Sequence, residues 1–465
     1  MTDAPWKGDA SSLVDAFRRG DRTPTEELDA SLSAVAVSDL NAFSFIDADR
    51  AHSFAAAADL TKPFGGVPFG VKELTSVEGW PATEASLAFK DTVATKTSTM
   101  ITRLIDDGGM VPFGLTTASE FGGINLTRTK LNGATRNPWN RDHTPGGSSG
   151  GAAAAVAGGL CTIATGGDGG GSIRIPAAFT GLIGLKHTYG RIPKGPGMVM
   201  ASMTAVSGCL ARSVRDAARW LDVTNGFDAR DPYSLPRVDD WEANLGTYQD
   251  SLRGKRVAIV PGLGRAIVHP ELDAAVRAHG EMLAREAGLT IVDVAIDVPE
   301  LSLEWALAGM SEIVMELGDR YPDCADDLTP EIAFGLKMGH KLYDIKVRAS
   351  IEAQRVAMNE AMASVFEACD FVIASTNPDI AFGAEGPMPQ EVDGVRTGLG
   401  NNGALTIPAN IYGCPAVSIP IGVSERGGLP YGMQVLAPHH REGWLLDLAL
   451  IAERERPWAL VAPGV

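Results

Sequence analysis

The most restrictive feature of this 465-residue sequence is a pair of glycine-rich segments that lie close together. Thr144 to Gly151 reads TPGGSSGG, and Gly166 to Pro176 reads GGDGGGSIRIP. Glycine loses more backbone entropy on folding than any other residue, so glycines at this density are costly unless bare backbone is needed. The two segments therefore predict a site at which the main chain itself makes the important contacts.

The second segment suits a loop that binds a negative charge. In the run Gly169, Gly170, Gly171 and Ser172, several consecutive N–H groups can turn toward one point. Attack on an amide carbonyl creates an oxyanion, which each preorganised donor stabilises by about 3 to 4 kcal/mol. Ser172 follows the glycines directly and is placed to be the nucleophile. The glycines alone leave a phosphate-binding loop or a tight turn equally open.

Standard motifs do not account for these segments. No Gly-Lys-Ser or Gly-Lys-Thr follows the glycines, so they do not form a P-loop. After the predicted strand 257–260, Gly262-Leu263-Gly264 begins a dinucleotide-like pattern, but Ile267 stands where the third glycine is required. Gly-x-Ser-x-Gly occurs around both Ser148 and Ser149, but Asp142 to Pro145 precedes it in place of the strand that a nucleophile elbow needs.

The charge balance argues against a nucleic-acid partner. Forty Lys and Arg residues against 57 Asp and Glu residues give a net charge of -17. Such a chain has no basic stripe to neutralise phosphates, so we expect no nucleic-acid binding. The charge serves solubility instead.

The cysteines and the uncharged runs indicate a cytoplasmic protein without a membrane segment. The cysteines form no Cys-x-x-Cys pair and have no metal-like histidine spacing, so we expect buried thiols in a reducing compartment and no metal site. The first ten residues lack the pattern of a secretory signal. A long uncharged run, Gly403 to Val423, contains three prolines and suits a buried sheet better than a membrane span.

Local patterns predict helices and strands in alternation. Thr23, Pro24 and Glu26 form a capping box that opens a helix running to Val37. Gly65 to Val71 is typical of a short strand, with Lys72 at its end. Past residue 250 the predicted strands are 257–260, 291–296, 371–374, 416–421 and 432–436, with helices over 271–287 and about 342–368. This order favours one large α/β domain.

Three motifs together resemble the amidase signature family: TPGGSSGG, DGGGSIR, and the lysine of VPFGVKEL. In that family a lysine, a serine with a cis peptide bond and a second serine 24 residues later form the catalytic triad. Here Ser148 and Ser172 are 24 residues apart, and Lys72 lies 76 residues before Ser148. Other family-like segments are NPWN from Asn137, GLKHTYGRIP from Gly184, LARSVRD from Leu210 and YGCPAVSIPIG from Tyr412.

The resemblance implies a single α/β domain over residues 1–465, with a mixed twisted β-sheet core flanked by helices. The signature core would span about 64–225, and a helical and strand region of about 250–375 would cover the pocket. The implied activity is hydrolysis of a carboxylic amide through an acyl-enzyme, without metal or cofactor.

The implied roles need an unusual lysine. A serine hydroxyl is a weak nucleophile until a base takes its proton. Histidine usually does this, and only His143 and His187 lie near the cluster in sequence. The family pattern instead gives the task to Lys72 acting through Ser148. Lysine can serve only if its pKa falls from about 10.4 toward 7 or 8, for which burial at a strand end is the available cause.

The remaining residues of the cluster are assigned supporting roles. The resemblance makes the N–H groups of Gly169, Gly170, Gly171 and Ser172 the oxyanion hole. Asp168 and Arg174 flank this loop with opposite charges, and we expect them to pair and hold it. Ser149 supports the site by hydrogen bonding or caps the alanine-rich helix that follows. Glu73 would point away from Lys72 and is expected to be solvated or structural.

The substrate is not determined by the sequence. In the family, a position shortly after the Ser-Glu-Phe segment lines the pocket, which here falls at Gly122 or Gly123. Ser148 is assigned to substrate binding as well. Three interpretations remain: a stand-alone amidase for a small or medium amide, possibly homodimeric; the glutamine-hydrolysing subunit of a tRNA-dependent amidotransferase, with partner subunits; and a non-catalytic binding protein. The last is disfavoured because all three catalytic positions are kept.

Overall fold

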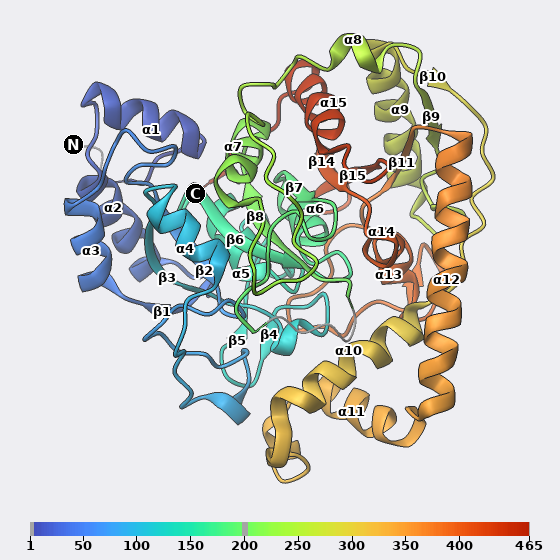
Figure 1. The fold of residues 1–465 in the computed structure, drawn as a ribbon, viewed down its shortest axis with the longest axis horizontal. Coiled ribbons are helices and arrows are strands. Elements are labelled where there is room, and N and C mark those ends of the chain that lie inside the picture. Colours follow the sequence, from blue (N-terminus) through green and yellow to red (C-terminus); the bar gives the residue numbers. More distant parts are fainter. Residues whose placement is uncertain (1–3, 198–202, 465) are drawn as a thin grey trace.

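Most strands form two mixed sheets that meet edge to edge (Figure 1), in a computed structural model that describes residues 4–197 and 203–464. Two separate two-stranded ribbons pair β4 (Arg128–Thr129) with β5 (Gly133–Ala134) and β12 (Glu391–Val392) with β13 (Val395–Arg396). The first sheet has the order β1 (Phe43–Ile46), β3 (Val111–Thr116), β2 (Pro68–Lys72), β6 (Ile163–Asp168), β8 (Val206–Ala211). The second has the order β10 (Thr290–Ile291), β9 (Arg256–Ile259), β11 (Phe371–Ser375), β15 (Pro430–Leu436), β14 (Ala416–Val423), β7 (Gly184–Lys186). An antiparallel bridge between Ile183 and Ala211 joins the sheets.

The centre of the first sheet carries Lys72. Strand β2 runs parallel to both β3 and β6, and all five of its residues are buried. Lys72 is its last residue, opposite Thr116 of β3. The backbone N–H of Lys72 donates to the Thr165 hydroxyl of β6 over 2.7 Å. Neighbours on both sides therefore hold the lysine at the carboxyl edge of the sheet.

Helices cover both faces of the sheets. On β6, Ile163 packs in the same hydrophobic cluster as Trp220 of α7, whereas Ala164 packs with the alanines of α5. Adjacent strand residues point to opposite faces, so α5 and α7 lie on opposite sides. The helices are α1 (Ala10–Arg19), α2 (Pro24–Val37), α3 (Ala48–Ala56), α4 (Thr99–Asp106), α5 (Gly150–Ala157), α6 (Arg174–Thr180), α7 (Val214–Thr224), α8 (Gln249–Leu252), α9 (Pro270–Ala287), α10 (Ser302–Leu317), α11 (Pro330–Leu342), α12 (Ile345–Ala368), α13 (Asn401–Ala404), α14 (Ile407–Tyr412) and α15 (Glu442–Glu455).

The two helices next to the glycine-rich segments are buried along their whole length. Every residue of α5 and of α6 is buried. A Cβ on Gly151 would lie within 2.5 Å of the Thr117 backbone, so this helix can approach the end of β3 only because the position is glycine. The glycines after Ser149 thus serve close packing.

Residues 250–375 divide between the second sheet and a helical arm. Strands β9, β10 and β11 lie in the sheet, whereas α10 and α11 pack together and α12 packs on α14. Figure 1 shows α12 along one edge of the molecule, with α10 and α11 beside its N-terminal end. No helix in the described part of the chain is long and apolar enough to cross a membrane.

The predicted α/β architecture is confirmed, and one predicted strand is largely wrong. The capping box of Thr23 and Glu26 opens α2, which ends at Val37 as predicted. Of the strand predicted over 291–296, only Ile291 lies in a strand, the two-residue β10, because pairing with β9 stops there. Val292, Val294 and Ile296 still pack in a core cluster. The alternation of apolar residues in this segment therefore reflects the burial of an irregular chain and not a strand.

Replacing Phe113 in the middle of β3 tests the packing beneath the site. Its ring is fully buried, and its centroid lies 5.0 Å from that of Phe43. We expect Phe113→Ala to lower the free energy of unfolding by about 3 to 5 kcal/mol, because it removes buried surface and leaves a cavity. Urea-induced unfolding measures this. Phe334→Ala on α11, where the ring is 65% exposed, is the control, and an equal loss there would contradict the account.

Candidate active site

Lys72 reaches two serine hydroxyls inside the protein. Its amine Nζ lies 2.7 Å from Oγ of Ser148 and 2.9 Å from Oγ of Ser149. The side chain is buried, so no water shell replaces these contacts. The predicted lysine and the first predicted serine are therefore in direct hydrogen-bonding contact, although they are 76 residues apart in sequence.

The environment of Lys72 makes it a base near neutral pH. Burial lowers the pKa of its amine from 10.5 to about 7, while the negative charges of Asp168 and Glu84 act in the opposite direction. Above that pH the amine is mostly neutral and can accept a proton from Ser148 across the same contact. A lysine of this kind meets the requirement for general-base chemistry.

Ser148 lies beside a glycine, Gly122. The peptide bond between Gly147 and Ser148 is cis. A Cβ on Gly122 would lie 3.4 Å from Oγ of Ser148, so this position faces the serine. At Gly123 a Cβ would instead lie 2.5 Å from Ile332 of α11. Of the two expected pocket glycines, Gly122 borders the site, whereas the Cα–Cβ direction of Gly123 points to α11.

Ser149 holds the lysine from a second side. It occupies the N-cap position of α5, but its hydroxyl makes no capping hydrogen bond. Its Oγ contacts Lys72 and accepts a 3.2 Å hydrogen bond from the N–H of Gly167. The sequence left two roles open for Ser149, capping of α5 and support of the site by hydrogen bonding. The contacts of its hydroxyl agree with the second.

Asp168 and Arg174 form a fully buried ion pair under the glycine loop. Nε of Arg174 lies 3.0 Å from Oδ2 of Asp168, and Nη2 lies 3.1 Å from Oδ1. Burial would raise the pKa of Asp168, but the charge and hydrogen bonds of Arg174, with the Asn410 amide, hold it well below its usual value. The guanidinium also donates to Gln434 and to the Thr406 carbonyl. Neither charge is therefore exposed to a substrate.

Some N–H groups of the glycine loop make no hydrogen bond among the described residues. The N–H of Gly171 donates to Oδ1 of Asp168 at 2.7 Å, so it is already engaged. Within the described residues, the N–H groups of Gly169, Gly170 and Ser172 make no hydrogen bond. The half-buried Ser172 hydroxyl likewise has no hydrogen-bond partner among them. Three of the four predicted donors are thus unoccupied.

The other candidate groups take structural places. Glu73 is buried and accepts hydrogen bonds from Thr83 and Asn132, so it is structural and not solvated. The ring nitrogens of His187 lie 2.8 Å and 2.7 Å from the carbonyl oxygens of Thr188 and Ser207. In the described chain, neither His187 nor His143 hydrogen-bonds to Ser148 or Ser172.

The cysteines are mostly buried, and the described residues contain no candidate metal-binding group. Four of the five cysteines are buried, and burial raises the pKa of Cys161 to about 12 and that of Cys414 to about 11. No group of three or more His, Cys, Asp or Glu side chains within residues 4–197 and 203–464 could hold a metal ion.

Two residues near the site were not identified from the sequence. Glu84 lies close enough to Lys72 to influence its charge, and its carbonyl accepts the N–H of Phe121, next to Gly122. Trp305 of α10 donates its indole N–H to the carbonyl of Gly169. Neither belongs to a motif, and Trp305 is 136 residues from its partner, so no local pattern could have found it.

Comparison with known proteins places the chain among amidases. The amidase family profile matches residues 28–446. The putative amidase AmiA2 of Mycobacterium bovis is 36% identical over 464 residues, covering 95% of this chain and 92% of the relative. A glutamyl-tRNA(Gln) amidotransferase subunit of a Synechococcus species is 33% identical over 469 residues, covering 94% of each chain.

Solved structures agree with this assignment. A bacterial aryl acylamidase of the amidase signature enzymes has a TM-score of 0.89 at 26% identity and covers 97% of each chain. A substrate complex of 6-aminohexanoate cyclic dimer hydrolase has a TM-score of 0.88 at 28% identity and covers 98% of each chain. The chain therefore belongs to the amidase family, the amidase signature enzymes, and is a hydrolase of amide C–N bonds.

Proposed function

We propose that this protein is a stand-alone serine amidase in which Ser172 is the nucleophile and Lys72 the base. The observation that carries the proposal is the buried amine of Lys72, 2.7 Å from Ser148, with a pKa lowered to about 7. Ser172 leads into α6 after three glycines. A neutral amine, a relay hydroxyl and a serine beside unoccupied N–H groups are the parts that acyl transfer requires.

In the proposed acylation step, the Ser172 hydroxyl attacks the amide carbon. Its proton passes to Oγ of Ser148 while the proton of Ser148 passes to the neutral amine of Lys72. The carbonyl oxygen becomes an oxyanion, which accepts hydrogen bonds from the N–H groups of Gly169, Gly170 and Ser172. Gly171 is omitted from this set because its N–H already donates to Asp168.

Collapse of the tetrahedral intermediate breaks the C–N bond. The ammonium of Lys72 returns a proton through Ser148 to the departing nitrogen, which leaves as ammonia or an amine. Water then attacks the acyl-enzyme along the same proton path, releasing the acid and restoring Ser172. The relay needs Ser172 within hydrogen-bonding reach of Ser148, and catalytic hydrogen bonds commonly tighten only when substrate binds.

The proposed substrate is a small or medium amide with an aryl or amino-acyl portion. The backbone of Gly122, which carries no side chain, borders the Ser148 hydroxyl. Two similar structures are an aryl acylamidase and a 6-aminohexanoate cyclic dimer hydrolase. The first is named for an aryl portion and the second for a dimer of an amino acid, which supports this range.

The second candidate function is a glutamine-hydrolysing subunit of a tRNA-dependent amidotransferase. It is favoured by the 33% identity to the glutamyl-tRNA(Gln) amidotransferase subunit of the Synechococcus species. It differs from the first proposal in requiring partner subunits.

Removing the three proposed catalytic side chains should separate their roles. We expect Ser172→Ala to abolish amide hydrolysis and labelling by a serine-directed phosphonate, because no nucleophile remains. Lys72→Ala should lower kcat by about 10²- to 10⁴-fold, the usual contribution of a general base, and Ser148→Ala somewhat less. Turnover of an anilide measures this. The control Ser31→Ala removes a buried hydroxyl of α2 that has no hydrogen-bond partner in the described part of the chain, and it should change kcat less than about twofold.

The pH dependence should report the amine of Lys72. Because its pKa is lowered to about 7 and only the neutral amine is a base, kcat/KM should fall below pH 7 and level off above it. A pH series with a neutral anilide measures this limb. An increase in kcat/KM that continued to pH 10 would contradict a lowered pKa.

The state of the purified chain discriminates the two candidate functions. If the protein is a stand-alone amidase, it should run as a monomer or homodimer and hydrolyse anilides at full rate. Size-exclusion chromatography and a panel of amides, with released amine or ammonia as the readout, test this. Glutamine hydrolysis that appears only after partner subunits are added would favour the amidotransferase function instead.

A further inference from the structure

Trp305 connects the helical arm to the glycine loop. It is the fourth residue of α10, and its indole Nε1 donates to the carbonyl oxygen of Gly169 at 2.8 Å. The ring also covers Gly170, where a Cβ would lie 2.6 Å from ring carbon Cζ2. One side chain from a distant helix therefore contacts two successive residues of the loop before Ser172.

The hydrogen bond to Gly169 controls the direction of the next N–H group. The carbonyl of Gly169 and the N–H of Gly170 belong to one planar peptide unit, which is not among the cis bonds of the described chain. In a trans peptide these two groups point in opposite directions. A fixed oxygen therefore fixes the N–H of Gly170, which makes no hydrogen bond within the described residues.

The following peptide unit is held differently. The carbonyl of Gly170 accepts a 2.6 Å hydrogen bond from the Thr406 hydroxyl, and the N–H of Gly171 donates to Asp168 at 2.7 Å. Both polar groups of this unit are bound by the protein. The unit between Gly169 and Gly170 combines an anchored oxygen with an N–H that makes no hydrogen bond among the described residues. The units ending at the N–H of Gly169 and of Ser172 do so too, through Asn410 and the N–H of Ile175. Of these three anchors, only the indole of Trp305 comes from α10.

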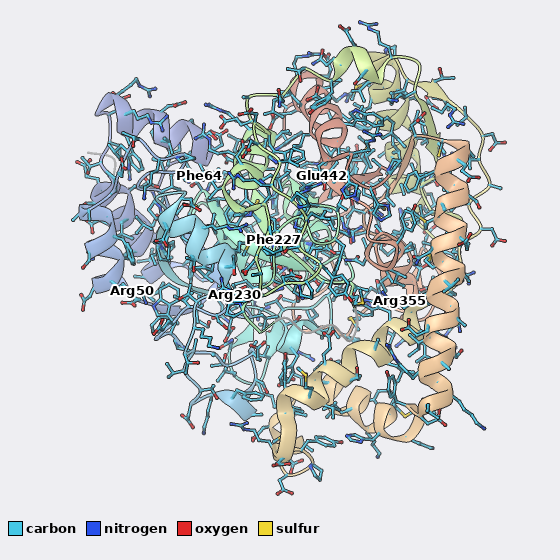
Figure 2. The ribbon with its side chains drawn as sticks, viewed as in Figure 1. Arg50, Phe64, Phe227, Arg230, Arg355 and Glu442 are labelled. Carbon is cyan, nitrogen blue, oxygen red and sulfur yellow. The ribbon has the colours of Figure 1, made fainter. Side chains whose placement is uncertain are left out.

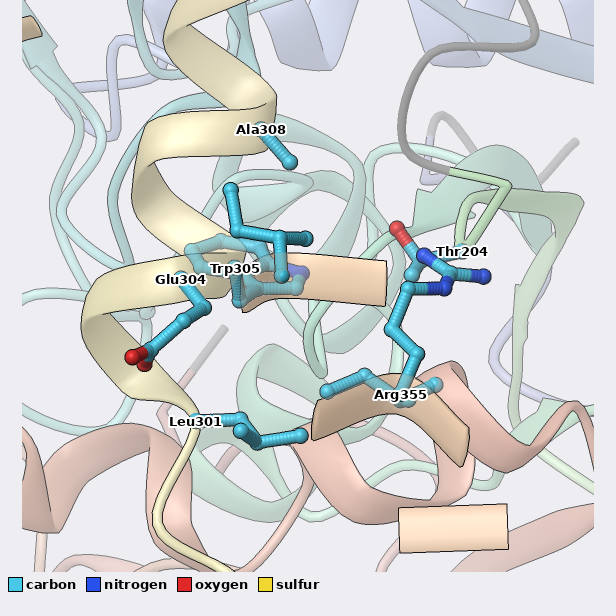
Figure 3. A pocket seen from close by; sticks show the side chains of 8 residues that line it. Thr204, Leu301, Glu304, Trp305, Ala308 and Arg355 are labelled. Atoms are coloured by element: carbon cyan, nitrogen blue, oxygen red, sulfur yellow. The ribbon is translucent and has the colours of Figure 1, made fainter. Parts of the chain in front are cut away.

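The indole of Trp305 borders a small pocket. Trp305 lines a small, mostly apolar pocket with Leu301 and Ala308, and Figure 3 shows these side chains on the same face of α10. The other lining residues are Thr204, Glu304, Ile351, Arg355 and Ile411. Figure 2 places Arg355 between α12 and the interior.

We propose that Trp305 is a positioning residue that aims the N–H of Gly170 at the oxyanion formed during acylation. The inference rests on the proposed function, in which Ser172 attacks the amide carbon. Trp305 touches no reacting atom and acts only through the peptide unit that it holds. The stabilisation of the oxyanion would then depend on how α10 packs against the glycine loop.

The variant Trp305→Phe tests the inference because it removes the indole donor and keeps an aromatic ring. A donor that is loosened but still present should cost less than the 10²- to 10³-fold loss for a deleted oxyanion donor. We expect kcat for an anilide to fall about tenfold, with KM changed less than about twofold, since the interaction strengthens only in the transition state.

Two further variants provide comparisons. Trp458→Phe removes an equivalent indole hydrogen bond, 3.0 Å long, to the carbonyl of Arg212, and should leave kcat within about twofold. Thr406→Val removes the hydrogen bond to the carbonyl of Gly170. Because the N–H of the same peptide unit, on Gly171, is still held by Asp168, kcat should fall less than in Trp305→Phe. Equal losses in Trp305→Phe and Trp458→Phe, or a change in KM alone, would overturn the proposal.

NMR relaxation gives a readout that does not depend on turnover, because it reports the motion of an N–H group whether or not that group is hydrogen-bonded. In protein labelled with ¹⁵N at glycine, the order parameter of the Gly170 N–H should be lower in Trp305→Phe than in wild type or Trp458→Phe. An unchanged order parameter would refute the positioning role even if kcat fell. Retained turnover in Ser172→Ala would instead refute the proposed function, and the relaxation comparison would still decide whether Trp305 holds the loop.

Discussion

Burial of one lysine amine at the end of a central strand is the constraint on which the site depends. Lys72 ends β2 between two neighbouring strands, so its side chain cannot turn away to solvent. An isolated charge in such a place is costly, and the amine lowers that cost by losing its proton near neutral pH. The hydroxyls of Ser148 and Ser149 then become its hydrogen-bonding partners. The free-energy cost of burying a charged amine thus makes Lys72 a base near neutral pH.

A second buried element, the ion pair of Asp168 and Arg174, links the glycine loop to the other sheet. Arg174 begins α6 and donates to Gln434 of β15 and Asn410 of α14, so one guanidinium joins three elements. Buried pairs are stable only when their remaining hydrogen bonds are satisfied, which these partners achieve. The charge of Asp168 also acts on Lys72 and opposes the lowering of its pKa. The loop and the base are therefore electrostatically coupled.

The parts of the site that could be predicted are those encoded in short motifs. Lys72, Ser148 and Ser172 were identified from motif residues and spacing, and the opposite charges of Asp168 and Arg174 lie six residues apart. The α/β architecture followed from local helix and strand patterns, except over 291–296, where burial imitated strand alternation.

The contacts that hold the loop could not be predicted in this way. Trp305 meets Gly169 across 136 residues, Thr406 meets Gly170 across 236, and Gln434 meets Arg174 across 260. Each is a single ordinary side chain whose partner is set by how α10, α14 and β15 pack. No local pattern carries that information. The engagement of the Gly171 N–H by Asp168 likewise appears only in three dimensions.

The central claim is that the amine of Lys72 is largely neutral at the pH where the enzyme works. Direct titration of that amine by NMR, in protein labelled with ¹⁵N at lysine side chains, tests it most directly. The Lys72→Met variant identifies the resonance by its disappearance. The account predicts a midpoint near pH 7. A Lys72 amine that stayed protonated up to pH 10, the ordinary range for lysine, would contradict it.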